Sequence, residues 1–258
     1  MKSGGLQSTF RKVIDANVRL SHATERRFGL ATDKTLWMTF GTQATDLISG
    51  LDDGKTVLDL GGGRRCIYAH AVVPAGRVQL VAVDISAAEL DANVDVSEVI
   101  VADIAKSIPV PSNSVDLVLS RALLEHVDGV QAAVNEMARV LKPGAVALHF
   151  VPCRYSLSGT AARILPFERL LKLTHAFLPG TRGQVEFPVK YDRCWPKALE
   201  AAFRSAGFSM VETEVTWAQP GYFEAVYPLF LIQALYEKVV RNLNLRNLAS
   251  YTMVRAVR

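Results

Sequence analysis

The sequence is poor in cysteine and has no long hydrophobic run. Its three cysteines are far apart and form no C-x-x-C pair, which excludes a disulfide scaffold and predicts a reducing, cytoplasmic location. The first residues contain no apolar segment typical of a secretion signal. The longest charge-free apolar run in the second half, residues 225–236, is interrupted by Pro228, whereas a membrane span needs about 20 residues. We therefore expect no transmembrane segment. A peripheral contact with a membrane is compatible with this sequence.

The sequence also has little net charge. The formal charge is +4 over 258 residues, and half of the residues are hydrophobic, which excludes intrinsic disorder. The charges are unevenly distributed: residues 84–136 hold ten acids and two bases, and residues 139–204 hold eleven bases and four acids. These blocks are either two solvated faces or, for the basic block, a contact with something anionic such as a phosphorylated substrate or lipid headgroups.

Alternating helix and strand patterns predict an α/β fold. The first fifty residues have the apolar spacing of helices, the second of which ends at Gly50. β-Branched runs then alternate with helical stretches, which is typical of βαβ units and a parallel sheet. The predicted strands are 55–60, 78–83, 99–102, 115–119, 145–151, 208–215 and 250–257, and the predicted helices among them are 130–141 and 195–206. We expect a helical cap over residues 1–50 and one domain over 51–258.

Two later segments break this rhythm. Residues 153–190 are rich in glycine and proline around a helix-like piece at 167–177, and we interpret them as an insertion or lid over the acceptor site. Residues 222–241 are strongly apolar and predict a helix buried on the sheet or in a homodimer contact. The alternative is an interfacial helix that rests on lipid.

A glycine turn follows the first strand. Gly61, Gly62 and Gly63 come directly after the buried run that contains Asp59. Glycines at this place let the backbone turn sharply and approach a ligand, with a helix N-terminus expected behind the turn. The dinucleotide pattern G-x-G-x-x-G would need a third glycine where this chain has Cys66, which argues against a nicotinamide dinucleotide site.

Acidic residues end the first three strands. Asp59 lies at the end of the first strand, Asp84 ends the second, and Asp103 follows the third. Because ligands bind at the carboxyl edge of parallel sheets, Asp84 is placed to accept the two ribose hydroxyls of an adenosine. Asp103 would accept from the adenine amino group, with Ile104 against the ring. For Asp84, a helix-capping role is the alternative.

These segments resemble the class I S-adenosylmethionine-dependent methyltransferases of the type 11 branch. The resemblance runs from about residue 55 to 152 and rests on VLDLGGG, LVAVDIS, VADIAKSIPVPSNSVDLVLSRALLEHV and NEMARVLKPGAVALHFVP. It implies a Rossmann-like, doubly wound sheet of seven strands, mostly parallel with an antiparallel last strand. It also implies an S-adenosyl-L-methionine cofactor, with Ile85 and Arg121 among the residues that bind it. GGGRRC, YDRCWP and LRNLASY further resemble a bacterial subgroup, which does not fix a substrate.

Arg64 and Arg65 depart from the family pattern, since the last glycine of that pattern falls at Arg65. We expect one of the two arginines to pair with the carboxylate of the cofactor's methionine part and the other to be a surface charge. The same departure motivates an alternative function, a non-catalytic binding or assembly subunit with a cofactor fold.

The predicted reaction is methyl transfer, with an acceptor oxygen favoured. His126 is the candidate general base, with a structural role as the alternative. His149, Tyr191 and Asp192 are candidates for the acceptor pocket, with a core position inside the fifth strand as the alternative for His149. The sequence contains no H-x-x-x-H pattern, so we predict no metal site. The Asp/Asn-Pro-Pro-aromatic tetrad of DNA amino-methyltransferases is absent, since residues 120–123 read SRAL, so we expect a small-molecule, glycan or lipid-linked acceptor and no nucleic acid.

Overall fold

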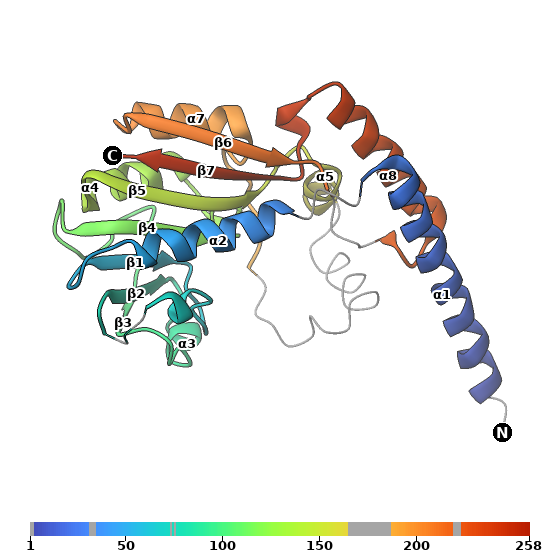
Figure 1. Ribbon diagram of the computed structural model, residues 1–258, viewed down its shortest axis with the longest axis horizontal. Coiled ribbons are helices and arrows are strands. Elements are labelled where there is room, and N and C mark those ends of the chain that lie inside the picture. The colour runs from blue at the N-terminus through green and yellow to red at the C-terminus, as the bar shows by residue number, and fades with distance from the viewer. Residues whose placement is uncertain (1–2, 31–34, 73, 75, 165–186, 219–222) are drawn as a thin grey trace.

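A seven-stranded sheet forms the centre of the computed structural model (Figure 1), which describes residues 3–30, 35–72, 74, 76–164, 187–218 and 223–258. The strand order is β3-β2-β1-β4-β5-β7-β6. β7 runs antiparallel to both of its neighbours, and the other pairs are parallel. This confirms the predicted mostly parallel sheet with an antiparallel last strand. The strands are β1 (Thr56–Leu60), β2 (Gln79–Asp84), β3 (Glu98–Val101), β4 (Val115–Arg121), β5 (Leu141–Pro152), β6 (Met210–Thr216) and β7 (Tyr251–Val257).

Helices cover both faces of the sheet, as a parallel sheet requires. On one face α2 (Thr35–Ser49) packs through Phe40 and Ile48. On the other face α4 (Val130–Val140) and α7 (Pro196–Ser205) pack through Met137 and Phe203. The predicted helices at 130–141 and 195–206 are thus present. The shorter elements are α3 (Ala87–Leu90), α5 (Leu157–Ile164), η2 (Ala69–Ala71), η3 (Leu124–His126) and η6 (Arg246–Leu248).

The two terminal helices pair with each other instead of covering the sheet. α1 (Ser3–Phe28) and α8 (Tyr227–Asn242) lie side by side at one end of the molecule (Figure 1). Phe230 is buried with Leu30, and the Thr24 and Tyr227 hydroxyls are hydrogen-bonded at 3.0 Å. The expectation that the apolar segment 222–241 packs on the sheet is therefore wrong, because α1 supplies its partner.

α8 still presents large apolar side chains to solvent. Leu229, Ile232, Leu235 and Val239 are each between 46% and 60% exposed. In the part of the chain that the structure describes, no helix combines the length and hydropathy that crossing a bilayer requires. The helix-like piece predicted at 167–177 lies outside the described residues.

Candidate active site

The glycine turn follows β1 at the carboxyl edge of the sheet. Gly61 has a φ of +70°, and its N–H donates to the carbonyl of Val83 on β2 at 2.7 Å. A Cβ on Gly61 would lie 2.9 Å from Leu123 Cδ1, and one on Gly62 would lie 2.7 Å from the Cβ of Ala82. Since no side chain fits at such distances, the packing of the turn against its neighbours already requires glycine here.

The helix expected behind this turn is replaced by a 3-10 turn, η2. The backbone after the glycines is tied instead to the loop before β3. Asn93 Nδ2 donates to Gly63 O at 2.8 Å, and Cys66 N donates to Asp95 Oδ2 at 3.1 Å. Because these side chains hold the segment in a non-helical path, no helix dipole is directed at the turn from residues 64–72.

Asp84 joins the glycine turn to the end of β2. Its Oδ2 accepts from Gly63 N at 3.2 Å, and its Oδ1 accepts from Ser86 N at 2.9 Å. The N-cap of α3 is Ser86, whose hydroxyl accepts from Glu89 N at 3.3 Å. Asp84 therefore does not cap α3. Each of its oxygens keeps a lone pair for another donor, and Ile85 beside it is 61% exposed.

Asp103 lies at the same edge, because β1, β2 and β3 run parallel in neighbouring positions. Its Oδ1 accepts from Ala105 N at 3.0 Å, and its Oδ2 lies 3.3 Å from Lys106 Nζ. The following Ile104 is buried in the core. The structure thus brings Asp84 and Asp103 to one sheet edge, and each oxygen of the Asp103 carboxylate already has one local partner.

The two arginines after the turn differ in their contacts. Arg64 donates from Nε and Nη2 to both carboxylate oxygens of Glu89, at 2.8 and 2.9 Å. Arg65 is exposed, and no described residue forms an ion pair with it. Arg64 is therefore the surface charge of the pair, which leaves Arg65 available to a ligand. Neither arginine is buried in the turn, so Arg64 and Arg65 no longer argue for a non-catalytic subunit.

A charged and aromatic cluster lies under the turn. Asp59 is 5% exposed, and burial raises its pKa to about 7 against the opposing effects of the Cys66 side chain and Arg121. The Arg121 guanidinium stacks 4.4 Å from the Trp37 ring of α2. The buried Tyr68 hydroxyl has no hydrogen-bond partner among the described residues. The sequence analysis missed Trp37 and Tyr68, because neither lies in a motif.

Glu125 and His126 form a second titratable pair, beyond the end of β4. His126 Nε2 lies 3.7 Å from Glu125 Oε1, and its Nδ1 lies 3.2 Å from the Pro188 carbonyl oxygen. Burial lowers the pKa of His126 and raises that of Glu125 to about 8. Glu125 Oε2 is buried without a hydrogen-bond partner in the described part of the chain. Sequence analysis overlooked this acid, although its place in an apolar stretch beside a histidine was a signal.

The three residues predicted for the acceptor pocket have packing or capping contacts. His149 is fully buried, hydrogen-bonded to Ser120 at 2.7 Å and packed on Phe203; burial lowers its pKa to about 3. Tyr191 is buried in the core cluster. Asp192 Oδ2 accepts from the N–H of Val130, the first residue of α4, at 2.9 Å. These contacts give the three residues structural roles, and their place in the acceptor pocket stays a prediction.

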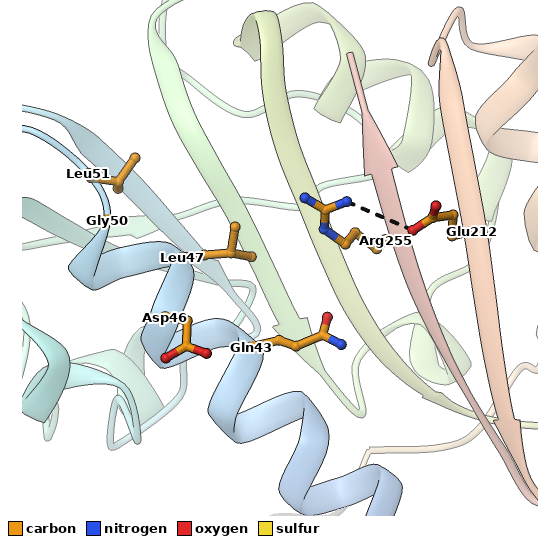
Figure 2. A pocket seen from close by; sticks show the side chains of 7 residues that line it. All are labelled: Gln43, Asp46, Leu47, Gly50, Leu51, Glu212 and Arg255. Carbon is orange, nitrogen blue, oxygen red and sulfur yellow. Dashed lines mark ion pairs between the residues drawn. The ribbon is translucent and has the colours of Figure 1, made fainter.

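A cavity of about 600 Å³ lies elsewhere, on a sheet face beside α2 (Figure 2). Figure 2 shows Gln43, Asp46 and Leu47 of α2 on one side and the Glu212–Arg255 ion pair of β6 and β7 on the other. Gly50 and Leu51 complete the lining and precede β1. The cavity is therefore separate from the glycine turn, which follows β1.

Comparisons with known proteins agree with this arrangement. Residues 58–149 match a protein family described as a methyltransferase domain. The ubiquinone/menaquinone biosynthesis C-methyltransferase UbiE of Pseudomonas paraeruginosa is 27% identical over 209 residues, which cover 74% of this chain and 80% of that protein.

Solved structures show the same fold. Haemonchus contortus phosphoethanolamine N-methyltransferase 2, in complex with phosphomonomethylethanolamine and S-adenosylhomocysteine, has a TM-score of 0.51 at 18% identity; the match covers 84% of this chain and 53% of that one. Geranyl diphosphate C-methyltransferase from Streptomyces coelicolor, in complex with Mg²⁺, geranyl diphosphate and S-adenosyl-L-homocysteine, has a TM-score of 0.54 at 14% identity, covering 87% of this chain and 80% of that one. This chain spans about half the length of the nematode enzyme.

The sheet order and the glycine turn followed by strand-end acids define a Rossmann-like methyltransferase fold. The chain contains a methyltransferase domain, and its relatives and fold support a class I S-adenosylmethionine-dependent methyltransferase. Two of the solved structures with this fold hold S-adenosylhomocysteine.

Proposed function

We propose that the ends of β1, β2 and β3 hold S-adenosylmethionine and that the acceptor binds beyond β4 and β5. The main support for this proposal is the position of Asp84. Its two oxygens accept from Gly63 N and Ser86 N and keep lone pairs for the ribose hydroxyls. The residues fit the cofactor in a second respect, because a Cβ on Gly63 would meet nothing closer than 3.9 Å. That space suits close approach of a ligand to the turn.

Other residues have supporting roles in this proposal. Asp103 would bind the adenine amino group, with Ile85 and Ile104 beside the ring. Arg65 and Arg121 are the candidates for the cofactor's carboxylate, since Arg64 is bound to Glu89. Asp59 would lie next to that charged end, because its carboxyl is within electrostatic range of Arg121.

The chemistry asks little of the protein beyond alignment and exclusion of water. When bound, the cofactor supplies a methyl group that is already activated on a sulfonium. A hydroxyl acceptor must still lose its proton, and a neutral imidazole is suited to receive it. Burial lowers the pKa of His126, so this ring is neutral at pH 7 and remains our candidate base.

We propose an acceptor that carries a hydroxyl group, in a small molecule, glycan or lipid-linked compound, with methylation at oxygen. The similarity to a C-methyltransferase favours a second candidate. Methylation at a ring carbon of a hydroxyaromatic acceptor also benefits from removal of the hydroxyl proton. His126 would have the same role in both reactions.

We propose a cytoplasmic location, because all three cysteines are free and buried. We also propose that residues 1–50 form a helical cap with two parts. α2 covers one face of the sheet, whereas α1 extends away from it beside α8 (Figure 1).

The test is methyl transfer itself. Protein and methyl-labelled S-adenosylmethionine are incubated with small-molecule, glycan and lipid extracts, and labelled products are separated and located by mass spectrometry. His126→Gln should abolish most of the transfer while S-adenosylhomocysteine affinity stays unchanged, and His70→Gln, at an exposed histidine near α2, is the matched control. Cofactor binding without transfer to any fraction would support a binding subunit instead.

A further inference from the structure

Arg154 stands just past the carboxyl end of β5 and has no assigned role. The strand order puts β3 and β2 at one end of this edge and places β4 and β5 beyond the glycine turn of β1. A cofactor with its adenosine at β3 and β2 would therefore direct its reactive end toward β4. The end of β5 is the next position along the edge, where an acceptor would have to lie.

Two backbone hydrogen bonds fix Arg154. Its N–H donates to Cys194 O at 2.7 Å, and its Nη1 donates to Tyr191 O at 2.9 Å. The guanidinium carbon lies 5.7 Å from the Tyr155 ring and 6.0 Å from the Trp195 ring. The side chain is therefore oriented by the YDRCWP segment, residues 191–196, which sequence analysis had singled out.

The other side of this guanidinium has no partner among the residues that the structure describes. Arg154 Nε is buried and without a hydrogen bond, and no described residue accepts from its Nη2 or forms an ion pair with it. The neighbouring Asp192 is engaged at the start of α4, and Glu125 lies beside His126. Arg154 as a whole is half-buried, and a buried guanidinium nitrogen with neither a hydrogen bond nor a counter-ion is unfavourable.

We propose that Arg154 binds an anionic group, a phosphate or a carboxylate, on the methyl acceptor. The inference rests on the proposed function and deepens it. The Nε and Nη2 donors form the planar fork that takes two oxygens of such a group at once. The excess of basic over acidic residues in 139–204 also favours an anionic ligand. Arg154 thereby selects acceptors by charge and orients them on the β5 side of the reacting centre.

Calorimetric titration of the protein with phenyl phosphate and with benzoate, in the presence of saturating S-adenosylhomocysteine, tests this. We expect saturable binding of one of the two probes, which also tells phosphate from carboxylate. Arg154→Gln should weaken that binding by about tenfold or more, and Arg154→Lys, which keeps the charge but not the fork, should weaken it less. The matched control is Arg193→Gln, an exposed base on the same segment.

The proposal is overturned if neither probe binds the wild-type protein, or if Arg154→Gln binds as tightly as wild type. Equal weakening in Arg193→Gln would mean non-specific attraction and would also overturn it. S-adenosylhomocysteine titration and thermal unfolding of each variant show whether it is folded. If S-adenosylhomocysteine fails to bind the wild type, the proposed function fails, whereas failure of the anion proposal is measured by the probe titration on protein that does bind S-adenosylhomocysteine.

Discussion

Replacing Asp84 by Asn tests the cofactor site with the smallest change in shape. In the wild type, the carboxylate accepts from Gly63 N at 3.2 Å and from Ser86 N at 2.9 Å. Asn has one acceptor oxygen, and its amide N–H₂ would face one of these donors, so one backbone bond is lost. A hydrogen bond to a charged group contributes about 1.5–3 kcal/mol. Asp84 is half-buried, so we expect the free energy of unfolding to fall by about 1 kcal/mol.

The effect on cofactor binding should be larger, because the ribose hydroxyls lose one of their two charged acceptors. We expect S-adenosylhomocysteine to bind about 1–3 kcal/mol more weakly, roughly five- to 150-fold. Calorimetry gives the affinity, and urea unfolding gives the stability of the same sample. Asp91→Asn is the control, since this acid is exposed beside α3. Unchanged affinity in a folded Asp84→Asn protein would refute the reasoning.

Three further predictions concern charge, packing and the terminal helices. The pKa of Asp59 is raised from 3.8 to about 7, so between these pH values the native protein holds a proton that the unfolded chain releases. The free energy of unfolding should therefore fall as pH rises from 4 to 7. Urea unfolding of Asp59→Asn should show up to about 4 kcal/mol less of this fall. Gly62→Ala forces a Cβ to 2.7 Å from that of Ala82 and should cost about 1–3 kcal/mol of stability; an unchanged melting temperature would contradict the packing. Phe230→Ala, at a side chain 2% exposed, should cost about 3–5 kcal/mol, whereas Ile232→Ser, at one 60% exposed, should cost little; equal effects would contradict the pairing of α8 with α1.

The strands and the strand-end acids were predictable because their signals are local. A buried strand that ends in three glycines, as at Leu60, has few conformations available. The carboxyl ends of parallel strands meet at one edge of a sheet. Once the strands were predicted to be parallel, the placement of Asp84 and Asp103 at the same edge followed.

What sequence analysis predicted incorrectly depends on contacts between distant segments. The helix expected after Gly63 is absent because Asn93 and Asp95 bind the backbone there, 29 or more residues along the chain. The hydrogen bond from Val130 N to Asp192 joins residues 62 positions apart, so the sequence did not predict it. The apolar pattern of α8 correctly required a partner, and nothing in that pattern specified α1 instead of the sheet.

A crystal structure of the protein with S-adenosylhomocysteine tests the central claim most directly. The account predicts ribose hydroxyls within about 2.6–3.2 Å of the Asp84 carboxylate, adenine beside Ile104, and the sulfur toward the end of β4. A ribose that makes no contact with Asp84, or a nucleoside bound in the cavity beside α2 (Figure 2), would contradict it.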